Sequence, residues 1–149
     1  MPVKDVCVRN VVHVRRETTI LEAAQLMRQH HVGDLIVADP DHDSVRPVGI
    51  ITDRDIVLSV VAPKLEASVI TVGDIMGDEL VTCREDMGVS ECIRKMRSKG
   101  VRRMPIVSER GDLVGIVSVD DLIEMMAEEL SELSKLIARE QGREVRLRR

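Results

Sequence analysis

The chain has 149 residues, 44% of them hydrophobic and 32% charged, which gives enough apolar material for a buried core and argues against disorder. Its formal net charge of −4 argues weakly against nucleic acid as the main partner, and no apolar stretch approaches the ~18 residues that a membrane-spanning helix requires. We therefore expect one domain, or two small halves sharing a core, with no nucleic-acid and no membrane partner.

The first predicted elements are a strand and a helix. Residues 11–14 form a short β-rich run. Thr19 then opens a helix, because Thr19 and Glu22 fit a capping box in which the hydroxyl and the carboxylate each accept an orphan amide proton. Apolar side chains over residues 20–27 recur at helical spacing, and the helix is predicted to stop near His31.

Two strands and a second helix follow. Residues 34–38 and 47–51 are predicted to pair through an acidic, solvated hairpin loop at residues 39–43. The second helix starts at residues 53–55. Thr52 is its predicted N-cap, because a hydroxyl there can bond the free amides of the first turn. The order of elements is β-α-β-β-α.

The rest of the chain repeats this order. When the sequence is shifted by 69 positions, residues 3–6 fall on residues 72–75. Past a three-residue insertion in the first hairpin, residues 49–55 fall on residues 115–121. The repeat predicts strands at residues 80–83, 103–107 and 113–117, a helix ending at Gly100, and a last helix capped by Ser118.

The repeat also predicts the boundaries of the two copies. The first copy occupies residues 3–60 and the second copy residues 72–127, and Pro63 breaks regular structure in the linker, residues 61–71. A copy this small cannot bury both faces of its sheet alone, so we expect the two copies to pack sheet to sheet. Residues 128–149 are predicted to be a C-terminal helix and a basic tail.

Both copies carry the same short motif. The pattern Gly-hydrophobic-hydrophobic-Thr/Ser-x-x-Asp stands at residues 49–55 and again at residues 115–121. Together with the order β-α-β-β-α, it resembles the cystathionine-β-synthase (CBS) motif pair, also called a Bateman module, over about residues 3–127. The resemblance implies an α+β fold in which tandem CBS motifs pack about a pseudo-two-fold axis, with two clefts between them.

The resemblance also implies a function. CBS pairs commonly bind AMP, ADP, ATP, NAD or S-adenosylmethionine in these clefts, so we expect a regulatory, signal-sensing module whose ligand is an adenine nucleotide, with AMP or ATP favoured and no required cofactor. In the family pattern the Asp bonds the ribose hydroxyls and the Thr or Ser bonds a phosphate. This assigns Asp55 and Thr52 to one cleft, and Asp121 and Ser118 to the other.

The chemistry of these residues agrees with that assignment. A carboxylate can accept hydrogen bonds from both hydroxyls of a cis-diol, and a hydroxyl with free amides at a helix N-terminus forms an anion site. Three positions of helix place Thr52 and Asp55, like Ser118 and Asp121, one turn apart on the same face. The alternative is that the hydroxyls only cap the helices and the acids only favour the first turn.

Two arginines lie where the family often has a basic residue that reaches the phosphates. Arg102 and Arg103 precede the strand at residues 103–107, and arginine suits phosphate because its charged fork is bidentate. The alternative is a solvated surface pair. The first copy has Gly33 and Asp34 here, and an acid would repel phosphate. We therefore expect unequal clefts, with a polyphosphate favouring the one that the arginines face.

An adenine ring would need an apolar slot. Because the chain has no Phe, Tyr or Trp, the slot must be aliphatic. The candidate walls are Val12, Val14, Ile36, Ile51, Val81, Pro105 and Val117, each of which could instead be plain core packing.

Other site classes find little support in the sequence. There is no phosphate loop, dinucleotide-binding glycine pattern, nucleophile elbow or zinc-protease motif, so we expect no catalytic residue and no enzyme. His30 and His31 lack a further ligand at suitable spacing, and we expect no metal site. The three cysteines form no close pair and the N-terminus does not resemble a signal peptide, which favours a cytoplasmic location.

The end of the chain carries an apolar seam. From Asp120 to Glu140, apolar residues recur at three- and four-residue steps, at Leu122, Met126, Leu130, Leu133 and Ile137. The seam either folds back on its own module or packs on a second chain. CBS modules usually dimerise through their helices, so the resemblance favours a homodimer. The basic residues 143–149 are expected to be loose.

No effector domain is recognised in the sequence, so the resemblance implies that a signal passes to an unknown effector protein. The alternative reading of the whole chain is a ligand-free interaction or oligomerisation scaffold.

Overall fold

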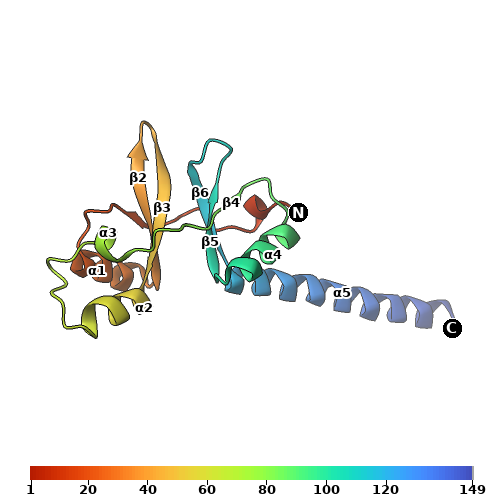
Figure 1. The fold of residues 1–149 in the computed structure, drawn as a ribbon. Helices are drawn as coiled ribbons and strands as arrows, with labels where there is room; N and C mark the ends of the chain where they lie inside the picture. The colour runs from red at the N-terminus through yellow and green to blue at the C-terminus, as the bar shows by residue number, and fades with distance from the viewer. Residues whose placement is uncertain (149) are drawn as a thin grey trace.

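The computed structural model describes residues 1–148 (Figure 1). It contains two three-stranded sheets, one for each copy. In each sheet the first strand pairs in parallel with the second, and the second and third form an antiparallel hairpin. The strands are β1 (His13–Val14), β2 (Asp34–Asp41) and β3 (Ser44–Thr52) in the first sheet, and β4 (Cys83–Arg84), β5 (Arg103–Val107) and β6 (Leu113–Ser118) in the second.

Helices complete the predicted order. In the first copy α1 (Ile20–His30) follows β1, and α2 (Asp53–Ile56) follows β3 and continues as the π-helical turn η2 (Val57–Val61). In the second copy the equivalents are α4 (Val89–Lys99) and α5 (Val119–Leu147). The order β-α-β-β-α is therefore confirmed in both copies, and the fold is α+β as predicted.

The ends of α1 and α4 largely follow the capping residues predicted from the sequence. Gly100 ends α4 with a φ of 67°, and His31 ends α1 in the same left-handed conformation with a φ of 55°. The Thr19 hydroxyl accepts from the Glu22 amide at 3.2 Å, as expected. The other half of that capping box differs, because the Glu22 carboxylate accepts from the Thr19 hydroxyl at 3.0 Å.

The first hairpin is longer than predicted. The loop expected at residues 39–43 was wrong in extent, because β2 continues to Asp41, which pairs with Ser44. Only His42 and Asp43 form the turn, with His42 at a φ of 52°. The inserted residues therefore lengthen the hairpin beyond its counterpart in the second copy.

Each copy begins with a short helix that packs on the other copy. Val3, in η1 (Val3–Asp5), is fully buried in the core of the second copy, and its amide bonds the Met87 carbonyl at 2.7 Å. Val72, in α3 (Val72–Ile75), is fully buried in the core of the first copy. Each half thus encloses its own apolar core, and the exchanged helices connect the two halves.

The motif glycines lie where the chain crosses between copies. A Cβ on Gly49 would come within 2.8 Å of the Met76 sulfur, and one on Gly115 within 2.6 Å of the Val8 carbonyl oxygen. Val8 also exchanges two backbone hydrogen bonds of 2.9 Å with Ile116. Close packing therefore accounts for the glycine that opens each motif, against the backbone of Val8 at Gly115 and against the side chain of Met76 at Gly49.

α5 projects away from the two halves as one continuous helix (Figure 1). The expectation of a loose basic end was wrong as far as Leu147, where the helix ends, while Arg149 lies outside the described residues. The seam does not fold back, because Leu130, Leu133 and Ile137 are 67%, 57% and 58% exposed. Between residues 1 and 148, no helix is both long and apolar enough to cross a membrane.

Candidate functional site

Two clefts lie between the copies at pseudo-symmetric positions. The Thr52 cleft has a volume of about 410 Å³ and is lined by Ile50 and Thr52 of β3, by Leu80 and Val81 before β4, and by Arg102 and Arg103 at the start of β5. The Ser118 cleft, of about 250 Å³, is lined by the equivalent Ile116, Ser118, Val11 and Val12, and by Asp34, Arg103 and Asp121. Each cleft therefore combines a helix start of one copy with a strand start of the other.

Both helix starts have the predicted polar pair. The Thr52 hydroxyl accepts from the Asp55 amide at 3.1 Å, and Oδ2 of Asp55 accepts from the Thr52 amide at 3.0 Å. Ser118 and Asp121 make the same two bonds, both at 3.1 Å. The hydroxyl–carboxylate pairs are therefore full helix caps. Among residues 1–148, Oδ1 of either carboxylate has no hydrogen-bond partner.

The two pairs relate differently to their clefts. Ser118 and Asp121 both line the Ser118 cleft. Thr52 lines its own cleft together with Asp53 and Arg54, whereas Asp55 is not among the lining residues. The structure thus brings the predicted pair to one cleft and only the hydroxyl to the other.

The arginines lie where the two clefts meet. Arg102 and Arg103 line the Thr52 cleft, and Arg103 also lines the Ser118 cleft. There, Nε of Arg103 pairs with Oδ2 of Asp34 at 3.1 Å. Asp34 and Arg103 occupy equivalent positions in the two copies, so this ion pair crosses the pseudo-two-fold axis.

The surroundings of Asp34 are unfavourable for a second negative charge. Burial raises the pKa of the Asp34 carboxyl, the charge on Arg103 opposes that rise, and Asp53 and Asp121 add to it. An anionic ligand in the Ser118 cleft would therefore meet two carboxylates, Asp34 and Asp121, and one arginine.

The Thr52 cleft has the opposite balance. Its lining carries the three guanidinium groups of Arg54, Arg102 and Arg103 against the carboxylates of Asp53 and Glu79. Arg102 is 73% exposed and its nearest acid, Asp120, is 3.7 Å away, so its fork remains available to a ligand. The two clefts thus differ in charge. Arg102 lines the Thr52 cleft and not the Ser118 cleft, whereas Arg103 lines both.

The candidate adenine walls divide into two groups. Val12 and Val81 line the clefts. The other five are buried in the cores or sheets, namely Val14, Ile36, Ile51, Pro105 and Val117. Sequence reasoning missed Ile50 and Ile116, although strand alternation could have found them, because each lies next to a buried core residue and so faces the opposite side of its strand.

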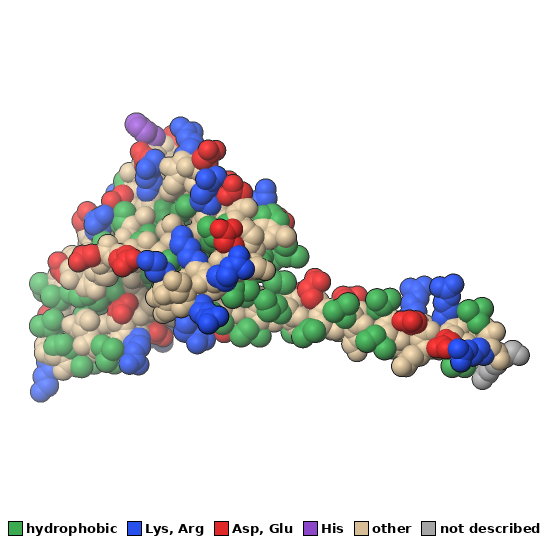
Figure 2. All heavy atoms as spheres, turned by 45° about the vertical axis from the view of Figure 1, so that its right-hand side comes forward, with side chains coloured by type: hydrophobic (Ala, Val, Ile, Leu, Met, Phe, Trp, Pro, Cys, Tyr) green, Lys and Arg blue, Asp and Glu red, His purple; other side chains and the backbone are tan. Residues whose placement is uncertain are grey.

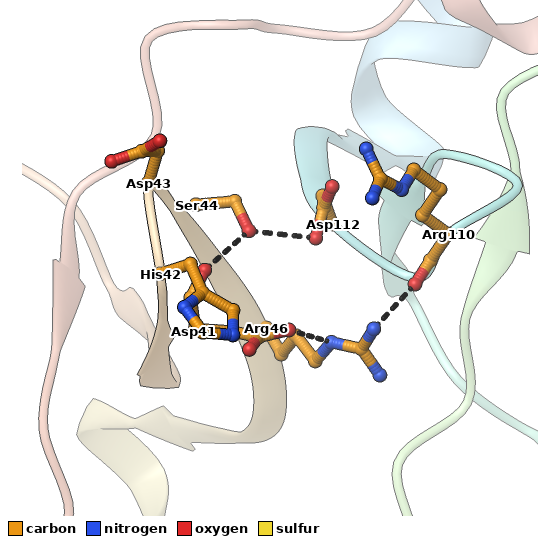
Figure 3. Close-up of a pocket in the computed structure, with 7 residues that line it drawn as sticks. All are labelled: Asp41, His42, Asp43, Ser44, Arg46, Arg110 and Asp112. Atoms are coloured by element: carbon orange, nitrogen blue, oxygen red, sulfur yellow. Dashed lines mark hydrogen bonds and ion pairs between the residues drawn. The ribbon is translucent and has the colours of Figure 1, made fainter.

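A third cavity, of about 320 Å³, lies between the tips of the two hairpins (Figure 3). The Ser44 hydroxyl donates to Oδ1 of Asp112 at 2.8 Å, and Arg46 donates to the Arg110 carbonyl at 2.9 Å while pairing with Asp41 at 2.6 Å. These bonds join the tips of the two hairpins. We therefore read this cavity as a structural contact.

The cysteines have the properties of packing residues. Burial, with a contribution from Cys83, raises the pKa of Cys92 to about 12, and burial also raises the pKa of Cys83. Neither thiol forms an appreciable thiolate at neutral pH, so neither has the character of a nucleophile. Within residues 1–148, no group of three or more His, Cys, Asp or Glu side chains is arranged to hold a metal ion.

The chain is similar in sequence to several known proteins. An uncharacterised protein of Methanopyrus kandleri is 36% identical over 123 residues, which make up 83% of this chain and 61% of that protein. Hypoxic response protein 1 of Mycobacterium tuberculosis is 33% identical over 84% of this chain and 85% of its own length. The chain thus spans only about three fifths of the first relative and most of the second.

Solved structures share the fold. The crystal structure of hypoxic response protein 1, with two coordinated zinc ions, matches with a TM-score of 0.72 over 84% of this chain and 98% of that one. The CBS domain pair of protein MJ0100, in complex with 5′-methylthioadenosine and S-adenosylmethionine, is 26% identical and matches with a TM-score of 0.74 over 87% and 98% of the two chains.

The CBS domain family matches residues 3–62 and 72–128. These two ranges hold both sheets and both hydroxyl–carboxylate pairs. The chain belongs to the CBS domain family, as a CBS domain pair.

Proposed function

We propose that this CBS pair is a regulatory sensor that binds an adenine nucleotide in the clefts between its two copies and catalyses no reaction. The observation that carries the proposal is the pair of pseudo-symmetric clefts, each with a capped helix N-terminus, a hydroxyl and an aliphatic wall. The crystallised MJ0100 pair, which holds two adenosine derivatives, supports this ligand class. Burial raises the pKa of both Cys83 and Cys92, so neither thiol is a suitable nucleophile.

We assign different ligands to the two clefts. The Thr52 cleft suits a polyphosphate such as ATP, because Arg54, Arg102 and Arg103 supply guanidinium groups at a helix N-terminus. The Ser118 cleft is smaller and carries Asp34 beside Asp121, so it suits AMP or an adenosine derivative with less negative charge. Asp121 would bond the ribose hydroxyls through its unpaired Oδ1.

Calorimetric titration with AMP, ADP, ATP, NAD and S-adenosylmethionine tests the proposal. We expect Asp121→Ala to abolish binding in the Ser118 cleft and Asp55→Ala to weaken binding in the Thr52 cleft. Both variants also lose a helix cap. Asp74→Ala is the matched control. The Asp74 carboxylate accepts the same kind of capping bond, at 2.9 Å from the Thr71 amide, but Asp74 lines neither cleft.

One observation favours a scaffold as the second candidate function. Both hydroxyl–carboxylate pairs already form complete capping boxes without a ligand. A scaffold predicts no heat with any of the five compounds and the same small loss of stability, about 1 kcal/mol, in all three variants. Saturable binding that is lost in Asp121→Ala and retained in Asp74→Ala would exclude it.

The proposal extends to the cellular location, the oligomeric state and the effector of the sensor. We propose that it works in the cytoplasm as a homodimer and passes its signal to a separate effector protein. The free energy available for the signal is the ligand's differential affinity for two arrangements of the copies. Incubation with ATP or NAD tests the absence of catalysis, since turnover that disappears in Asp121→Ala would contradict it.

A further inference from the structure

We propose that α5 pairs with α5 of a second copy of this chain in antiparallel orientation. The proposal specifies the homodimer named above and does not depend on whether the clefts bind a nucleotide.

The first observation is an uncovered seam. Leu122, the first residue of the predicted seam, is only 4% exposed and belongs to the second core, so the exposed seam begins at Ile123. Ile123, Met126, Leu130, Leu133 and Ile137 follow one another at steps of three and four residues, which is the a/d spacing of a coiled coil. Their side chains are between 43% and 67% exposed in the single chain. Figure 2 shows hydrophobic side chains gathered along the projecting helix. A seam this regular is typical of a helix that packs on another helix.

The seam leads into an apolar groove at the base of α5. A cavity of about 370 Å³ lies between α4 and α5, and it is lined by Ile93, Met96, Val101, Leu122, Ile123 and Met126. Ile123 and Met126 belong to both the groove and the seam. A partner helix along the seam would therefore continue into the groove.

The charges along α5 favour antiparallel pairing. Residues 120–132 contain six acidic side chains and no basic one. Residues 135–148 contain five basic side chains against Glu140 and Glu144, and Figure 2 shows the basic groups near the free end. An antiparallel pair sets the acidic half of each helix beside the basic half of its partner, whereas a parallel pair sets acid beside acid.

The two glutamates support the same orientation. Glu140 and Glu144 continue the seam spacing after Ile137. In a parallel pair each glutamate would face the same glutamate of the partner chain, which would place like charges in the seam. In an antiparallel pair centred near Leu133, they reach the base of the partner's α5, where Arg97 and Arg102 line the groove.

The oligomeric state of the full chain is the first test. Analytical ultracentrifugation should find a dimer for the natural sequence and a monomer for the double variant Leu130→Ser, Leu133→Ser. Both leucines are exposed in the single chain, so the core remains intact, which circular dichroism checks. Ser131→Ala, Ser134→Ala is the matched control on the same turns and should remain dimeric. A monomeric natural chain, or a dimer that survives the double variant, would overturn the proposal.

Distance measurement tests the orientation. In a Cys7→Ser background, where the remaining Cys83 and Cys92 are buried, a spin label is attached at Arg146→Cys. Double electron–electron resonance should give a distance of roughly 40 Å between the labels of the two copies in the antiparallel pair, because each residue adds 1.5 Å of rise. In a parallel pair the labels would lie about 10 Å apart. The short distance would overturn the proposal.

The dimer should also respond to salt. Added salt should weaken an antiparallel dimer, because it screens attraction between opposite charges, and would strengthen a parallel one. Calorimetry on the monomeric double variant separates this proposal from the sensor proposal. If the natural chain binds a nucleotide but stays monomeric, the pairing proposal alone fails. If the natural chain dimerises but binds no nucleotide, the sensor proposal alone fails.

Discussion

At the scale of single residues, one ion pair lies where the two clefts meet. Asp34 and Arg103 are equivalent in the repeat and pair with each other at 3.1 Å, with side chains 22% and 30% exposed. The repeat alone could predict that these residues differ between the copies. It could not predict that they meet, because their contact depends on how the copies dock.

We expect anion binding in the Ser118 cleft to strengthen as the pH falls through the raised pKa of Asp34, because protonation removes a negative charge from the cleft. Stability changes in the same direction. The folded state holds this proton more tightly than the unfolded chain, so the contribution of Asp34 to stability rises as the pH falls from its folded pKa towards its ordinary value.

AMP affinity, measured by calorimetry from neutral to mildly acidic pH, checks this prediction. The natural chain is compared with Asp34→Asn, so that protonation of the AMP phosphate affects both series equally. The variant should bind more tightly at neutral pH and show a smaller change with pH. Identical pH profiles for the two proteins would contradict the assigned role of Asp34.

At the scale of elements, local patterns predicted α1 and α4 well. Their apolar spacing lies within the helices, and their end signals, such as Thr19 and Gly100, lie directly beside them. The exchange of η1 and α3 between copies could not be predicted, because helices of three and four residues carry no readable periodicity. The helix was predicted as far as Glu140, but its continuation to Leu147 was missed, because the charged residues at this end resemble a solvated tail as much as a helix.

The exchanged helices should matter for stability. Val3→Ala and Val72→Ala each remove two methyl groups from a fully buried site, and we expect each to lower the free energy of unfolding by about 2 kcal/mol. Urea denaturation measures the change. Val69→Ala, at a side chain that is 69% exposed, is the control and should change stability little. If Val3→Ala behaved like the control, η1 would not be part of the second core.

The motif glycines give a second prediction at this scale. Gly115→Ala should lower stability by roughly 2 kcal/mol, because its Cβ would lie 2.6 Å from the backbone oxygen of Val8 and the crossing segment must shift. Gly142→Ala should instead raise stability by up to about 1 kcal/mol, since nothing lies within 4 Å and the position is inside α5. Thermal unfolding measures the melting temperatures of both variants. Equal changes in melting temperature would refute the packing role of Gly115.

At the scale of the whole molecule, the ligand clefts and the proposed dimer surface share a residue. Arg102 lines the Thr52 cleft on one side and the groove between α4 and α5 on the other. Its guanidinium group can turn to a phosphate in the cleft or to a partner's glutamate in the groove, and a single fork cannot serve both fully. We therefore expect Arg102 to couple the proposed ligand binding to the proposed pairing.

This coupling predicts that ATP weakens the dimer. Because linkage is reciprocal, the monomeric Leu130→Ser, Leu133→Ser variant should bind ATP more tightly than the dimer does, by the same factor. Sedimentation with and without saturating ATP measures the change in the dimer dissociation constant. Calorimetry on the dimer and on the monomeric variant measures the change in ATP affinity. Arg102→Ala should leave a dimer that no longer responds to ATP. A dimer constant that ATP does not change, in a chain that binds ATP in the Thr52 cleft, would show that Arg102 does not transmit the signal.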